Sequence, residues 1–257
     1  MGGADRLELC GNLGLGGGTT PSVGLFKSVK KAVPGVPIMV MIRPRTGDFL
    51  YTPAEIDVMV EDIRTFKSLA AEGVVFGVLK TDGWIDVSKT RILAEEATGM
   101  QVCFHRAFDM TPNPADELDA EAPLTQLAQI PNIARVLSSG RGTSAPKSTQ
   151  PLRIFLRVAQ TLSLEHRTST TPLTILPGSG VNPSTVSQLL HDLLPFGLHE
   201  VHLSGGGWIE GGMQFRKDGM GMGVGGRGEW GIWRTNEDAV RQIRKVVDEA
   251  WNNRKRV

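Results

Sequence analysis

The sequence predicts an α/β protein, a TIM-like (β/α)8 barrel formed as one domain by residues 1–257. Its length of 257 residues is typical of a single barrel. Short apolar, β-branched segments recur about every 28 to 38 residues, which is the length of a strand, a helix and two loops. A doubly wound open sheet has the same repeat but one site-bearing switch point. Because polar residues follow nearly every apolar segment here, the barrel is favoured.

The strands are predicted where apolar runs are short and rich in β-branched residues. They are expected at 5–10, 37–43, 73–80, 101–108, 134–140, 172–178 and 200–205. This set is one strand short of a closed eight-stranded barrel. Because Met1 stands close to the first strand, we expect the missing strand to be encoded upstream or supplied by a partner.

The helices are predicted from capping residues and from apolar side chains at helical spacing. Thr52, Pro53 and Glu55 form the pattern of a capping box, and an apolar stripe continues from there to Gly73. Further helices are expected near 22–33, 86–97, 114–129, 151–164, 182–194 and 235–251. The segments near 140–171 and 211–233 are expected to contain divergent loops.

Composition excludes several classes of protein. With 28 Lys and Arg against 27 Asp and Glu, the net charge of +1 gives no field for nucleic acid or an anionic membrane. No apolar run is long enough for a membrane helix, and no signal pattern is present. Cys10 and Cys103 cannot form a disulfide framework, which indicates a reducing compartment. We therefore expect a cytoplasmic protein.

Three residues at strand ends are candidates for acid and base catalysis. Glu8, His105 and Asp109 are expected at the carboxyl ends of two predicted strands. Carboxylate and imidazole groups there could transfer protons to and from a substrate. A lone histidine in a strand is, however, more often a core residue with its hydrogen bonds satisfied.

A second set of residues predicts an anion site. Arginines bind carboxylates and phosphates with two donors, and glycine turns after the last strands of barrels often bind phosphate. The candidates are Arg43, Arg45, Ser139, Gly178, Gly180, Ser204 and Gly205. The alternatives are that the glycines only form turns, and that the arginines form structural ion pairs with Asp48 or Glu8.

The order of several short motifs resembles the CutC copper homeostasis family. These motifs are GGADRLELC (2–10), GGTTPS (17–22), MIRPR (41–45), GDFLY (47–51), FHRAFD (104–109), VLSSG (136–140), PGSG (177–180) and GMQFR (212–216). Together they extend over most of the chain. The family carries an additional strand and helix before the first motif, and these are absent here.

The resemblance implies a TIM-like barrel, a cytoplasmic homo-oligomer and a role in copper homeostasis. It also implies Cu(I) binding through cysteine, for which Cys10 is the matching residue. Cys103 is expected to pack as a small apolar residue instead. The alternative function is an enzyme that acts by acid and base chemistry on a small phosphorylated or carboxylated substrate. The expected partner is therefore a copper ion or a small anionic molecule.

Overall fold

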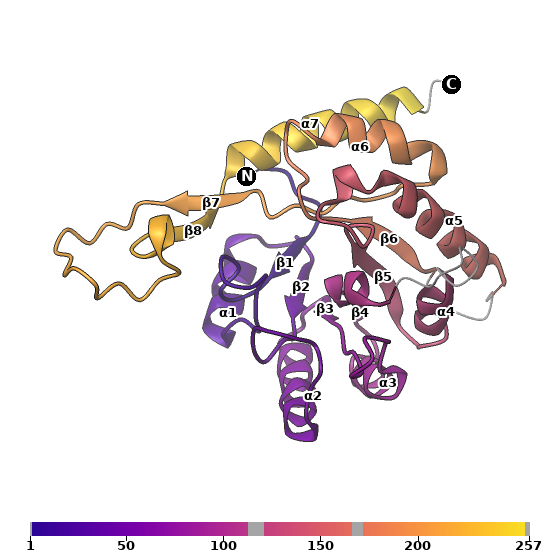
Figure 1. Ribbon diagram of the computed structural model, residues 1–257, viewed down its shortest axis with the longest axis horizontal. Coiled ribbons are helices and arrows are strands. Elements are labelled where there is room, and N and C mark those ends of the chain that lie inside the picture. Colours follow the sequence, from indigo (N-terminus) through magenta and orange to yellow (C-terminus); the bar gives the residue numbers. More distant parts are fainter. Residues whose placement is uncertain (1, 113–120, 166–171, 255–257) are drawn as a thin grey trace.

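A parallel six-stranded sheet forms the centre of the computed structural model, which describes residues 2–112, 121–165 and 172–254 (Figure 1). The strands are β1 (Leu7–Leu9), β2 (Ile38–Met41), β3 (Gly73–Phe76), β4 (Gln101–Phe104), β5 (Ile133–Ser138) and β6 (Thr174–Pro177). They are arranged in chain order, each hydrogen-bonded to the next. This order has no switch point, which confirms the TIM-like α/β prediction and excludes a doubly wound sheet.

Helices follow the strands and cover one face of the sheet. They are α1 (Val23–Ala32), α2 (Pro53–Ser68), α3 (Val87–Glu96), α4 (Ala122–Ala128), α5 (Thr149–Glu165), α6 (Val186–Leu193) and α7 (Glu237–Arg254). The capping box of Thr52 and Glu55 is present at the start of α2. Helix α5 occupies much of the 140–171 segment in which a divergent loop is expected. Residues 114–120 of the predicted 114–129 helix lie outside the described residues.

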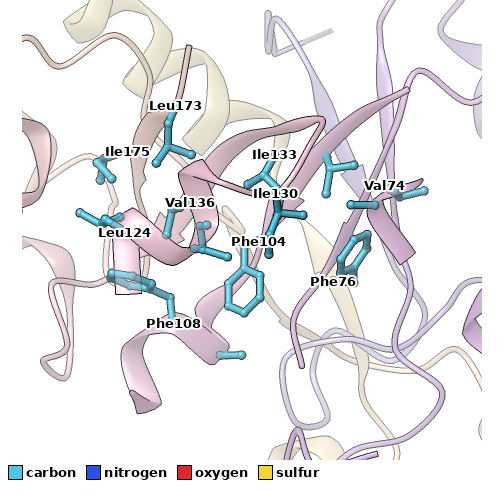
Figure 2. Close-up of a cluster of buried hydrophobic side chains, with 14 of the residues drawn as sticks. Val74, Phe76, Phe104, Phe108, Leu124, Ile130, Ile133, Val136, Leu173 and Ile175 are labelled. Carbon is cyan, nitrogen blue, oxygen red and sulfur yellow. The ribbon is translucent and has the colours of Figure 1, made fainter. Parts of the chain in front are cut away.

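The sheet separates two apolar clusters because successive residues of a strand face opposite sides. The larger cluster lies between the sheet and the helices and includes the aligned residues Val40, Val74 and Val102. Figure 2 shows part of it around Phe104 and Phe108. The smaller cluster lies on the other face, inside the curve of the sheet. Residues of this interior face would line the barrel.

The prediction of a strand over 200–205 is wrong. This segment makes one backbone hydrogen bond to β6, from His202 N to Pro177 O at 2.9 Å, and it has no ladder on either side. Gly205 has a φ of +54°, which ends any extended conformation there. The segment nevertheless lies between β6 and β1, because Glu200 contacts Arg6, Arg135 and Thr174.

An antiparallel hairpin replaces the last part of the expected barrel. It consists of β7 (Gly206–Ile209) and β8 (Ile232–Thr235), and it extends away from the sheet in Figure 1. Its long connection contains the short helix η5 (Gly226–Gly228) and coincides with the divergent segment expected at 211–233. Further 3-10 helices within the described residues are η1 (Arg106–Met110), η3 (Ala145–Lys147) and η4 (Leu194–Phe196). The strand expected upstream of the chain stays a prediction.

Candidate functional site inside the sheet

Sulfur-containing side chains gather on the interior face of the sheet. Met39, Met41 and Cys103 belong to the small interior cluster, and Cys10 packs against it. Met41 and Cys103 stand in one row, each aligned with Val75 of β3. Since Leu9 of β1 pairs with Val40 of β2, Cys10 is level with Met41 in the same register. Two thiols and two thioethers therefore share one apolar environment.

The loop after β1 covers the Cys10 thiol. Gly18 has a φ of +96°, and a Cβ atom added to it would lie 2.9 Å from Cys10 Sγ. A larger residue at position 18 would thus clash with the sulfur in a backbone conformation that only glycine adopts readily. The loop closes over the cluster at the carboxyl end of β1.

Both thiols are held in the protonated form. Burial, and then the charge of Glu8, raises the pKa of Cys10 to about 12. Burial also raises the pKa of Cys103. Because the thiolate is the nucleophile and the metal ligand, neither residue is an activated nucleophile at neutral pH. A metal ion that bound here would have to displace a thiol proton.

Glu8, His202 and Gly178 meet beside this cluster. Glu8 pairs in register with Met39, so its side chain faces the interior, and its Oε2 lies 4.0 Å from Nδ1 of His202. Gly178 lies on the other side of His202: a Cβ atom added there would be 3.3 Å from the His202 Cβ. The backbone N–H of Gly178 donates to Ser138 O at 2.9 Å. The structure therefore brings Glu8 and Gly178 together, with a histidine between them.

His105 is buried at the end of β4 in its neutral form. Its Nδ1 accepts a hydrogen bond from Ala107 N at 3.2 Å, which leaves the ring proton on Nε2. Among the described residues, Nε2 has no hydrogen-bond partner. Burial, and then the positive charge of Arg43, lowers the pKa of His105 to about 3. His105 is thus a weak base and a free hydrogen-bond donor.

The two candidate arginines are engaged by loop backbone. Nη1 of Arg43 donates to Gly18 O at 3.0 Å, and Nη2 donates to Gly47 O at 2.9 Å. Its guanidinium also lies 5.0 Å from the centre of the Phe49 ring, which contacts His105 on another side at 4.8 Å. Through these contacts Arg43 connects the loop after β1 to the loop after β2.

Arg45 points toward the start of α2. Its Nε lies 2.5 Å from Glu55 Oε1, and its Nη1 lies 3.0 Å from Asp48 Oδ1. The ion pair with Asp48 is the structural alternative that the sequence left open. The pair of arginines expected to act as one clamp therefore divides its donors among separate loop and helix partners.

Asp109 joins η1 to the loop after β5. Its carboxylate accepts hydrogen bonds from Ser138 Oγ at 2.6 Å, Ser139 N at 2.9 Å and Arg141 N at 3.2 Å. It also forms an ion pair with Arg106 at 2.8 Å. With these partners Asp109 and Ser139 position the loop, and Arg106 and Ser138 complete the network, which strand-end patterns alone do not define.

The remaining candidates have turn roles. Gly180 has a φ of +75°, and its carbonyl accepts from Thr185 Oγ1 at 2.8 Å in the turn before α6. Ser204 is exposed. Gly205 turns the chain toward β7, and a Cβ atom added to Gly205 would lie 3.2 Å from the Val240 side chain. The glycines of these two loops lie in separate turns. A role in turn formation is the alternative to anion binding that the sequence leaves open.

A cavity of about 460 Å³ lies between the loop after β1 and the β7–β8 hairpin. Its walls include Glu8 and Cys10 from the end of β1 and Trp208 and Trp233 from the hairpin. Sequence patterns did not identify the tryptophans, because the hairpin was expected to be a loop. The sequence signal for these tryptophans is weak: they are bulky aromatic residues that stand beside glycine-rich stretches.

Two features are absent from residues 2–112, 121–165 and 172–254. No group of three or more His, Cys, Asp or Glu side chains there could hold a metal ion. No helix in these ranges combines the length and the apolar character needed to cross a bilayer.

The chain was compared with known proteins. The CutC family model matches residues 1–207. A CutC family protein of Chromobacterium violaceum is 37% identical over 249 residues, covering 97% of this chain and 92% of the relative. One from Vibrio vulnificus is 42% identical over 208 residues, covering 79% of this chain and 74% of the relative.

A solved structure gives the same result. The copper homeostasis protein CutC from Streptococcus agalactiae superposes with a TM-score of 0.65 at 27% identity, covering 77% of this chain and 88% of that one. The match in family model, in sequence and in fold extends over the sheet and the interior face described above. The chain therefore belongs to the CutC family.

Proposed function

We propose that this protein acts in copper homeostasis by binding Cu(I) on the interior face of its sheet, with Cys10 and Met41 as ligands. The observation that supports this proposal is the shared cluster of Cys10, Met39, Met41 and Cys103. Cu(I) prefers soft thiolate and thioether ligands, and these four residues bring such donors together in an apolar site. The name of the Streptococcus agalactiae protein points to the same metal.

The ligand pair follows from the register of the first two strands. Cys10 is level with Met41, whereas Cys103 is separated from Met41 by β3. Cys10 is also the less buried thiol, and unlike Cys103 it lines the cavity beside the loop after β1. Because its pKa is raised to about 12, Cu(I) uptake would release one proton from Cys10 at neutral pH.

The experiment is a Cu(I) titration of the full chain in competition with a chromophoric Cu(I) chelator under reducing conditions. Cys10→Ala is expected to weaken Cu(I) affinity at least about tenfold, since it removes the only thiolate of the pair. Met41→Leu is expected to weaken it severalfold. Met59→Leu is the matched control, because Met59 is buried in the cluster on the other face of the sheet. Unchanged affinity in Cys10→Ala would contradict the proposal.

A second candidate function is the binding of a small carboxylated or phosphorylated molecule, as in an acid and base enzyme. One observation favours it: the Nε2 donor of His105 is buried without a partner among the described residues, and an anionic oxygen would satisfy it. His105→Asn keeps an acceptor for Ala107 N but removes that donor. Titration of acetate and inorganic phosphate should show binding to the wild type and at least tenfold weaker binding to the variant. Equal binding by both proteins would exclude the site.

A further inference from the structure

We infer that the cavity between the β1 loop and the hairpin is a binding site for a small organic cation with an apolar body, such as an arylalkylamine. Its volume of about 460 Å³ lies in the range of sites that enclose a small molecule. This inference does not depend on copper binding, since it concerns a different ligand and is argued from Glu8 and the two tryptophans rather than from the thiols.

The charge of the cavity selects a cation. Among the described residues Glu8 is the one charged side chain in its lining, and only 15% of that side chain is exposed. Within the described residues its one ion-pair contact is to Nδ1 of His202 at 4.0 Å, and no lysine or arginine pairs with it. A buried carboxylate without a close cationic partner is costly, and an ammonium group would offset that cost.

The walls select an apolar body. Trp208 and Trp233 face each other across the hairpin, with ring centres 5.4 Å apart at an interplanar angle of 78°. Leu13 and Leu15 add aliphatic surface from the β1 loop. Indole rings attract cations by their π electrons and also bury apolar groups well. The cavity thus offers one anionic group and a largely apolar wall.

Glycines maintain the position of the aromatic wall. A Cβ atom at Gly14 would lie 2.9 Å from Trp208, and one at Gly228 would lie 3.1 Å from the same ring. The β1 loop and the hairpin therefore approach the indole from separate parts of the chain. The ring is fixed by this packing, so the cavity is formed before a ligand arrives.

The test uses three probes with the same phenylethyl body and different charge: phenethylamine, 2-phenylethanol and phenylacetate. Binding is measured by calorimetry and by tryptophan fluorescence on the full chain. We expect phenethylamine to bind at least about tenfold more tightly than either of the others, because only it pairs with Glu8. Equal or tighter binding of the alcohol or the acid would overturn the inference.

Variants assign the effect to the cavity. Glu8→Gln should remove the preference for the amine, whereas Glu61→Gln, an exposed carboxylate on α2, should keep it. Trp208→Leu should weaken the amine at least fivefold, whereas Trp84→Leu, outside the cavity, should not. Circular dichroism confirms that each variant is folded. Retained amine preference in folded Glu8→Gln would overturn the inference.

Discussion

Arg6 and Glu200 form an ion pair between positions 194 residues apart. Arg6 precedes β1, and Glu200 belongs to the segment that follows β6 and α6, so the pair connects the two edges of the sheet. Glu200 also accepts from Arg135 Nε at 2.7 Å and from Thr174 Oγ1 at 3.2 Å. The sheet is therefore joined at this point by side chains, where a strand ladder was expected.

Replacement of Glu200 should loosen this closure. Glu200→Gln leaves two partly buried arginines without their carboxylate, and we expect a loss of about 1–3 kcal/mol in the free energy of unfolding. Glu61→Gln removes an exposed pair with Arg64 and should change stability by less than about 1 kcal/mol. Urea unfolding of both variants checks this, and equal losses would show that the Glu200 network does not close the sheet.

The Asp109 network should be similarly sensitive. Asp109→Asn replaces an acceptor of several hydrogen bonds with a group that presents its own N–H donors, and we expect a loss of about 2 kcal/mol. Asp57→Asn, on the exposed face of α2, is the control and should stay within about 0.5 kcal/mol of wild type. Thermal unfolding provides the measurement. If Asp109→Asn left the thermal stability unchanged, the loop after β5 would be held by other contacts.

The pH dependence of stability should report the burial of His105. Its folded pKa is lowered to about 3 from the ordinary 6.5, so between these values the unfolded chain binds a proton that the folded protein does not. Stability attributable to this group should fall by up to about 1.4 kcal/mol per unit as pH drops below about 6.5, and it should be flat above that. His105→Asn should remove this slope. Parallel curves for the two proteins would contradict the assignment.

The two thiols should react slowly in the native protein. Because burial raises the pKa of both Cys10 and Cys103, the thiolate fraction at about pH 8 is far below that of an unfolded cysteine. Iodoacetamide labelling followed by mass spectrometry should show at least about tenfold slower modification than in denaturant. In Cys103→Ala only Cys10 remains. Rapid labelling of this variant in its native state would show that the Cys10 thiol is not covered and that its pKa is not raised.

Sequence patterns predicted the repeating part of the fold well. Strands β1 to β6 and helix α2 formed where periodicity and capping placed them, because each depends on local composition and on burial between neighbours. The prediction of a strand over 200–205 was wrong for a different reason. Its apolar residues suit a strand, but Gly205 turns the chain away, and the segment is held by the long-range Glu200 contacts that local patterns do not encode.

The candidate site was less predictable because strand parity gives direction but not partners. Parity fits the interior positions that Glu8 and Cys103 have in the structure. It could not show that the carbonyls of Gly18 and Gly47 would take the donors of Arg43. The cavity wall formed by Trp208 and Trp233 was also not predicted, because a glycine-rich stretch favours a loop over a hairpin.

The most direct test of the copper proposal is X-ray absorption at the copper edge of the Cu(I)-loaded protein. Ligation by Cys10 and Met41 predicts an inner coordination shell of sulfur atoms, with the number of sulfur ligands reduced in Cys10→Ala and again when Met41→Leu is added. A shell of nitrogen or oxygen atoms, or a sulfur shell that Cys10→Ala leaves unchanged, would contradict the account.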